Sequence, residues 1–152
     1  MQHLFIFSPG RWVGGGKITF NTSPELIRFY TSWNVEEKKN GVIECTQQIE
    51  MQTLHENVRN QFSIHDISPG ILMTRFKIDL ENELIGSAKG VGIVDTKTIA
   101  WEFRGNKGIE GFEVYEIQEN GDYMLHAEYS SVDDFRTIVD GRIWSKSPSN
   151  PA

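Results

Sequence analysis

The sequence predicts an all-β protein folded as a single antiparallel up-and-down β-barrel of about eight to ten strands. Short runs rich in Ile, Val, Thr, Tyr and Phe alternate apolar with polar residues, as strands with one buried face do. Glycine, proline and asparagine interrupt these runs at intervals of roughly 8–15 residues, a spacing close to that of sandwiches and barrels. The sequence shows no crossover helices, and a meander of this many strands avoids exposed edges by closing on itself.

The turns are predicted from residues that tolerate tight backbone geometry. Asn40-Gly41 and Asn120-Gly121 each lie between alternating apolar runs. A two-residue type I′ hairpin needs positive φ at both central positions, which Asn-Gly supplies, so we expect such a hairpin at both places. Further breaks are expected at Ser8-Pro9-Gly10, at Ser68-Pro69-Gly70 and between Gly105 and Gly108.

The first long strand is expected to begin near Gly10. Three consecutive glycines at positions 14–16 suit a strongly coiled strand that pairs with two neighbours. The next segment, Ser23 to Trp33, could begin a helix, because Pro24 suits the first helical position after a Ser23 N-cap. We nevertheless predict a strand there, since the segment is rich in the β-branched and aromatic residues that favour strands.

The later strands are predicted from period-2 alternation. Ile99, Trp101 and Phe103 share one face of such a strand, opposite Glu102 and Arg104. The same interpretation groups the following sets of residues on inward faces: Ile43, Cys45, Gln47, Ile49 and Met51; Val58, Asn60, Phe62 and Ile64; Leu72, Phe76, Ile78 and Leu80; and Tyr123, Leu125, Ala127 and Tyr129. The last strand covers Phe135 to Trp144. The barrel domain is therefore assigned to residues 1–145 and a polar, disordered tail to residues 146–152.

Composition narrows the class of protein. The 152 residues suffice for one domain with a sizeable core. The net charge of -6 and the lack of a Lys/Arg stripe argue against nucleic-acid binding, and no stretch approaches the ~20 apolar residues of a membrane helix. A single cysteine, Cys45, excludes an internal disulfide, and the N-terminus lacks the basic and apolar regions of a signal peptide. We therefore expect a cytoplasmic protein.

Two short motifs resemble the calycin superfamily of lipocalins and fatty-acid-binding proteins. Gly10-x-Trp12 opens the first strand, and Arg142 lies near the end of the last one. In that superfamily an early Gly-x-Trp and a late Arg meet at the closed end of the barrel. The resemblance implies that Gly10, Trp12 and Arg142 close the barrel here. The Arg142 guanidinium would cover the Trp12 indole in a cation–π contact worth about 0.5–2 kcal/mol.

The chain departs from particular branches of that superfamily. It leaves no room for the helical pair of fatty-acid-binding proteins and lacks the disulfide of classical lipocalins. Nitrobindin-like haem barrels use a histidine near the end of the chain, and the last predicted strand contains none, so haem is not expected. The spacing Phe5-x-x-x-x-Gly10-x-Trp12 is similar to the opening of the S-type phycobiliprotein chromophore lyases. That likeness leaves a tetrapyrrole-binding lyase as an alternative.

No residue pattern predicts a catalytic or metal site. The histidines lack the spacing of a metal pair and are expected at the surface, and Cys45 is expected to be a buried, inert thiol. Interior amides need partners, so Gln47 and Asn60 could pair with each other, hold water or orient a ligand. The full set of predicted ligand-binding residues is Gln47, Asn60, Phe62, Phe76, Trp101, Phe112 and Tyr123.

These observations predict a non-enzymatic carrier, a lipocalin-like monomer or homodimer that binds a small apolar or amphipathic molecule such as a lipid, without a resident cofactor. The first alternative is a calycin that acts as a chromophore lyase. The second is a protein-interaction module with a filled barrel, whose Trp33 or Trp144 anchors a partner from the outer face.

Overall fold

The computed structural model describes residues 3–52, 56–84, 86–105 and 108–146. Each of these segments is strand, turn or connecting loop, and the described part contains no helix long and apolar enough to cross a membrane. The strands are β1 (Gly10–Phe20), β2 (Leu26–Val35), β3 (Ile43–Met51), β4 (Glu56–Pro69), β5 (Thr74–Asn82), β6 (Gly86–Val94), β7 (Thr98–Gly105), β8 (Glu110–Ile117), β9 (Tyr123–Ser130) and β10 (Arg136–Ser145).

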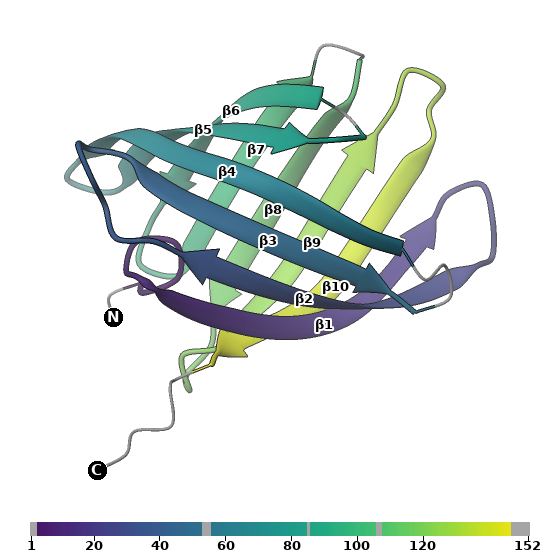
Figure 1. The fold of residues 1–152 in the computed structure, drawn as a ribbon, viewed down its shortest axis with the longest axis horizontal. Coiled ribbons are helices and arrows are strands. Elements are labelled where there is room, and N and C mark those ends of the chain that lie inside the picture. The colour runs from purple at the N-terminus through teal and green to yellow at the C-terminus, as the bar shows by residue number, and fades with distance from the viewer. Residues whose placement is uncertain (1–2, 53–55, 85, 106–107, 147–152) are drawn as a thin grey trace.

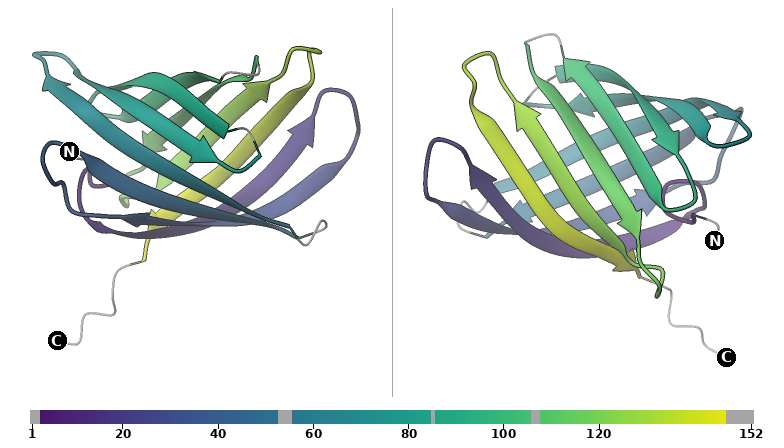
Figure 2. Two further views of the ribbon diagram at one scale, coloured as in Figure 1. Left: turned by 45° about the horizontal axis from the view of Figure 1, so that its top comes forward. Right: turned by 180° about the vertical axis from the view of Figure 1, so that it is seen from behind.

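The strands form one closed antiparallel barrel, which confirms the predicted fold class (Figure 1). Every strand pairs with its neighbours in the chain, and β1 also pairs with β10, so the meander closes without a free edge. In Figure 1, β1 to β4 cross in front of β8 to β10, and the right view of Figure 2 shows the same two halves of the wall from behind, with β8 to β10 in front. The core lies between the two halves. The strand predicted for Ser23 to Trp33 is present as β2.

Side chains alternate between the interior and the solvent along each strand. Trp101 and Phe103 are buried, whereas Glu102 and Arg104 are exposed, as predicted. The main core extends from Trp12, at the end of the barrel where β1 begins, to Ala88 and Phe103 in the other half. A smaller cluster around Ile18, Ile27 and Phe29 lies toward that other end.

Three side-chain positions predicted from the sequence are wrong. Two residues expected inside the barrel lie outside, and one expected outside lies inside. Leu72 lies in the β4–β5 turn and is largely exposed, because β5 begins only at Thr74. Trp33, offered as an outer anchor, is buried inside the barrel, whereas Trp144 is exposed. Phe112, offered as an interior wall residue, faces outward and is 38% exposed.

The two Asn-Gly turns differ. Asn40 (φ 53°) and Gly41 (φ 79°) both have positive φ, which confirms the type I′ hairpin between β2 and β3. In the β8–β9 turn, Gly121 has φ 90° but Asn120 does not have positive φ, so the second prediction is wrong. The Asn120 side chain accepts a hydrogen bond from the Asp122 backbone N–H at 3.0 Å and holds a wider turn instead.

The N-terminal segment before β1 folds across the end of the barrel where β1 begins (Figure 1). Phe5 is fully buried, and its ring lies 4.9–5.5 Å from the rings of Trp12, Trp33, Tyr115 and Tyr123. This segment acts as a plug, made by the chain's own N-terminus.

Further contacts hold the plug in place. His3, which was expected at the surface, is instead buried, with Nδ1 2.7 Å from the Tyr123 hydroxyl and Nε2 2.6 Å from the Asp95 carbonyl oxygen. Ile6 is fully buried with φ 61°, a conformation that disfavours β-branched side chains. Such a conformation persists only where the surrounding packing enforces it, so the segment must be firmly docked.

The predicted contact between Trp12 and Arg142 is absent. Trp12 points into the barrel, whereas Arg142 lies outside, where its Nη2 and Nε donate to Asp122 Oδ2 at 2.6 and 3.1 Å. The register pairs Trp12 with Ser145 and Arg142 with Gly15, so the two side chains are offset along the wall as well. Trp12 does help to seal the barrel, but it packs against Phe5 and Tyr123, and Gly10 only begins the strand.

The tail begins where the barrel ends. The Lys146 backbone N–H donates to the Arg11 carbonyl oxygen at 2.8 Å. The rest of the predicted tail, residues 147–152, lies outside the described residues, as does His55.

Candidate functional site

A buried carboxyl group lies inside the barrel on β8. Glu113 is 4% exposed, and both of its oxygens accept hydrogen bonds from tyrosine hydroxyls. Tyr115 Oη donates to Oε1 at 2.5 Å, and Tyr129 Oη donates to Oε2 at 2.8 Å. Tyr115 is two residues along the same strand and Tyr129 is on the neighbouring strand β9, so the alternation of side chains brings all three to one interior face.

The pKa values of this cluster follow from its burial. Loss of solvent raises the pKa of Glu113, and the two tyrosine hydrogen bonds oppose that rise. Burial and the neighbouring carboxyl raise the pKa values of Tyr115 and Tyr129, so both hydroxyls remain protonated donors. Within the described residues, no Lys, Arg or His nitrogen forms an ion pair with Glu113.

Trp101 lies directly across from Glu113 on β7. Its indole is close enough to lower the pKa of that carboxyl, yet its Nε1 meets no partner in hydrogen-bonding geometry among the described atoms. The Nε1 of Trp33 is likewise buried without a partner in that part of the chain, and the two indole rings lie 6.4 Å apart. A buried N–H without a partner costs about 1–3 kcal/mol, so these two donors are unusual in a core.

A row of polar side chains crosses the opposite half of the wall. Gln47 donates to Thr31 Oγ1 at 3.1 Å, Asn60 donates to Gln47 Oε1 at 2.9 Å, and Asn82 donates to Asn60 Oδ1 at 2.5 Å. Gln47 and Asn60 are direct cross-strand partners on β3 and β4. The prediction that Gln47 points inward is confirmed, and of the alternatives left open, the two amides pair with each other.

The predicted apolar wall is largely present. Phe62, Phe76, Trp101 and Tyr123 are all buried in the main core, where several of these rings lie against one another or against Phe5. Whether any of them contacts a ligand stays a prediction.

The sequence did not predict the cluster of Glu113, Tyr115 and Tyr129, because the alternation of residues in β8 does not show which of its two faces points into the barrel. The signal was in the hairpin: the short β8–β9 turn pairs Ile117 with Tyr123, which places Tyr115 and Glu113 on the same side as the predicted inward face of β9. The register therefore turns Phe112 outward.

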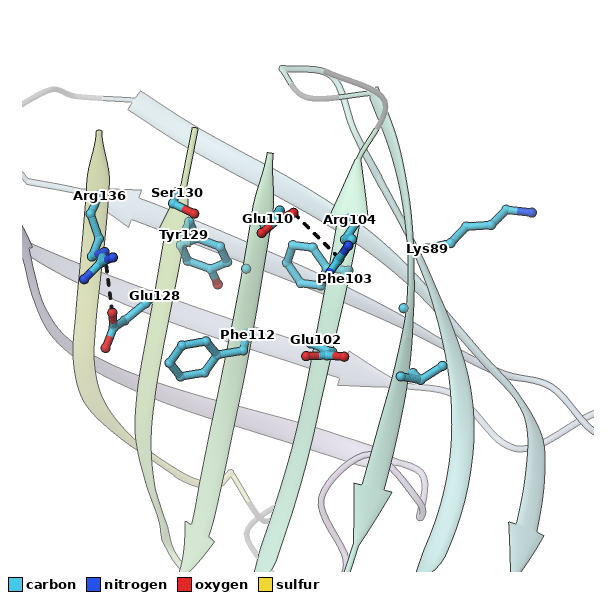
Figure 3. Close-up of a pocket in the computed structure, with 13 residues that line it drawn as sticks. Lys89, Glu102, Phe103, Arg104, Glu110, Phe112, Glu128, Tyr129, Ser130 and Arg136 are labelled. Atoms are coloured by element: carbon cyan, nitrogen blue, oxygen red, sulfur yellow. Dashed lines mark ion pairs between the residues drawn. The ribbon is translucent and has the colours of Figure 1, made fainter. Parts of the chain in front are cut away.

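Phe112 lines a groove of about 400 Å³ on the outer wall, over β6 to β10 (Figure 3). The labelled side chains in this groove carry both charges. Arg104 Nε lies 3.7 Å from Glu110 Oε1, and Arg136 Nε lies 3.9 Å from Glu128 Oε1. A second hollow of about 250 Å³ lies beside it, lined by the exposed Val91, Ile93 and Phe112 and the half-buried Ala100 and Val114, among others.

The surroundings of Cys45 and His126 do not indicate a reactive site. Cys45 is buried and free, and burial together with Glu44 and Glu36 raises the pKa of its thiol to about 12, as expected for an inert cysteine. His126 lies on the outer face between Asp140 and Glu128, with ring nitrogens 2.6 and 2.9 Å from their carboxylates. The described residues contain no group of three or more His, Cys, Asp or Glu side chains placed to hold a metal ion.

No known protein family and no curated protein matches this sequence. The class of protein is therefore defined by the fold and the interior: a closed ten-stranded antiparallel barrel, plugged at one end by its own N-terminus and containing a buried carboxyl with two tyrosine donors.

Proposed function

We propose that this protein is a calycin-like carrier that binds a small, mostly apolar molecule inside the barrel. The observation that carries the proposal is the polar cluster of Glu113, Tyr115 and Tyr129 near Trp33, whose Nε1 has no hydrogen-bond partner among the described residues. Apolar side chains of similar volume would pack such a core at lower cost, because a buried carboxyl and an unpaired N–H both oppose folding. Ligand pockets commonly place a few polar groups of this kind in an apolar wall.

The expected binding mode combines two contributions. Apolar ligand surface removed from water contributes roughly 25 cal/mol per Å². A ligand acceptor that meets the Trp33 indole N–H would also recover the cost of leaving that donor unpaired. Cys45, the only cysteine, is a buried free thiol and does not need an oxidising compartment, which is consistent with a carrier in the cytoplasm.

Native mass spectrometry of the purified protein tests for a molecule that travels with it. In parallel, titration with the uncharged apolar probe N-phenyl-1-naphthylamine is followed through tryptophan fluorescence. Binding inside the barrel changes the emission of Trp33 and Trp101, and the change persists in W144F, which removes only an exposed indole. The carrier proposal fails if no small molecule copurifies and if neither this probe nor the simple amphiphiles described below bind at micromolar to millimolar concentration.

The outer groove favours a second candidate function, a protein-interaction module. Val91, Ile93 and Phe112 expose apolar surface on β6 and β8, and charged side chains of both signs lie beside them. Sedimentation velocity over a range of concentrations tests self-association through this face, and F112D is expected to abolish it. The chromophore-lyase alternative is tested by the visible spectrum after incubation with a linear tetrapyrrole, where an unchanged spectrum argues against it.

A further inference from the structure

Among the described residues, the barrel interior contains the carboxyl group of Glu113 but no lysine or arginine side chain. Every lysine and arginine in the described part of the chain is exposed. Of the three described histidines only His3 is buried, and it lies in the plug, where its ring nitrogens contact the Tyr123 hydroxyl and the Asp95 carbonyl oxygen. A charge buried in a protein needs a partner of opposite sign or must be neutralised, and the chain supplies Glu113 with hydrogen-bond donors only.

The hydrogen-bonding capacity of Glu113 is only partly used. A carboxylate has about four acceptor sites, and each oxygen here receives one tyrosine hydroxyl. The remaining sites can accept further N–H donors. The two tyrosines cannot provide a positive charge, because their hydroxyls are neutral donors.

Aromatic rings surround the same carboxyl. The Trp101 and Tyr115 rings lie 5.0 Å apart, and Trp33 lies 6.4 Å from each of them. The faces of tryptophan and tyrosine attract cations through their ring quadrupoles, most strongly where water is excluded. A carboxylate beside such rings is the combination of groups that recognises an ammonium ion on an apolar body.

We infer that the barrel selects lipophilic amines, in which a protonated nitrogen is attached to an apolar chain or ring, and discriminates against fatty-acid anions. This inference rests on the proposed carrier function. The ammonium group pairs with the free acceptor sites of Glu113 and lies against the indole of Trp101, and the apolar body occupies the aromatic interior. An anionic headgroup in the same position meets the Glu113 carboxyl group instead of a cation, because every lysine and arginine of the described chain is exposed.

The test compares three ligands that share one chain length and differ in charge: octylamine, octanol and octanoate. Isothermal titration calorimetry on the unmodified protein measures each Kd. We expect octylamine to bind at least tenfold more tightly than octanoate, with octanol between them. This comparison requires no substitution, so it stands even if a variant fails to fold.

The E113Q variant then assigns the preference to the interior carboxyl. The amide has nearly the same shape but no charge, so the ratio of octanoate to octylamine Kd is expected to fall to within about threefold. E116Q removes an exposed carboxyl from the same strand and is expected to leave the ratio unchanged.

The outcomes separate the two proposals. Equal or tighter binding of octanoate overturns the selectivity for amines and leaves the carrier function standing. Persistence of the amine preference in a folded E113Q also overturns the inference, because the preference then arises elsewhere. If none of the three ligands binds and the probe and mass-spectrometry experiments are negative too, the carrier function itself fails.

Discussion

Truncation of Phe5 to alanine tests whether the N-terminal segment is an integral plug of the barrel. Phe5 is fully buried and contacts four aromatic rings at centroid distances of 4.9–5.5 Å. Removing a buried phenylalanine costs about 3–5 kcal/mol through lost burial and the cavity left behind. Folded domains are stable by only about 5–15 kcal/mol, so F5A should lose a large share of the stability.

Urea unfolding followed by tryptophan fluorescence measures this loss. For a chain of this size, with a denaturant slope of about 2–3 kcal/mol/M, the midpoint should fall by roughly 1–2.5 M. L4A is the matched control, because Leu4 belongs to the same segment but is 56% exposed, and its effect should stay within about 0.5 kcal/mol. A loss below about 1 kcal/mol in F5A would show that the segment does not seal the barrel.

Three further substitutions test other parts of the structure. A Cβ at Gly92 would overlap the Phe76 ring, so G92A should cost about 1–3 kcal/mol in urea unfolding, and an unchanged midpoint would contradict the packing. Y129F leaves Glu113 Oε2 without its tyrosine donor and should cost about 1–3 kcal/mol at neutral pH, measured the same way; a neutral effect would mean that the bond does not form. The carboxylates hydrogen-bonded to His126 raise its pKa above 6.5, so that interaction stabilises the fold fully below pH 6.5 and is lost as the pH rises through the raised value. Because the ring is partly exposed, H126Q should destabilise by no more than about 1 kcal/mol at pH 5.5 and by less at pH 9, and an equal effect at both pH values would refute the assignment.

The candidate site was predictable in part. Gln47 and Asn60 were placed inside from the alternation of their strands, and the structure shows them hydrogen-bonded to each other. Glu113 was not expected there, because an isolated carboxyl normally favours solvent, and only the hydroxyls of Tyr115 and Tyr129 make its burial tolerable. The two hydroxyls come from different strands, β8 and β9, so the register between these strands decides whether both reach the Glu113 carboxyl group.

The sequence by itself determined the class of fold and most of the inward and outward faces. Alternation with a period of two and closely spaced turn residues are local signals, and they specify a meander of strands without reference to distant contacts. The tertiary structure alone decided which residues close the end of the barrel and which side chains line its interior. Phe5 covers Trp12, Arg142 pairs with Asp122 outside, and Phe112 faces the solvent, because each of these arrangements follows from contacts between segments far apart in the chain or from a one-residue choice of register.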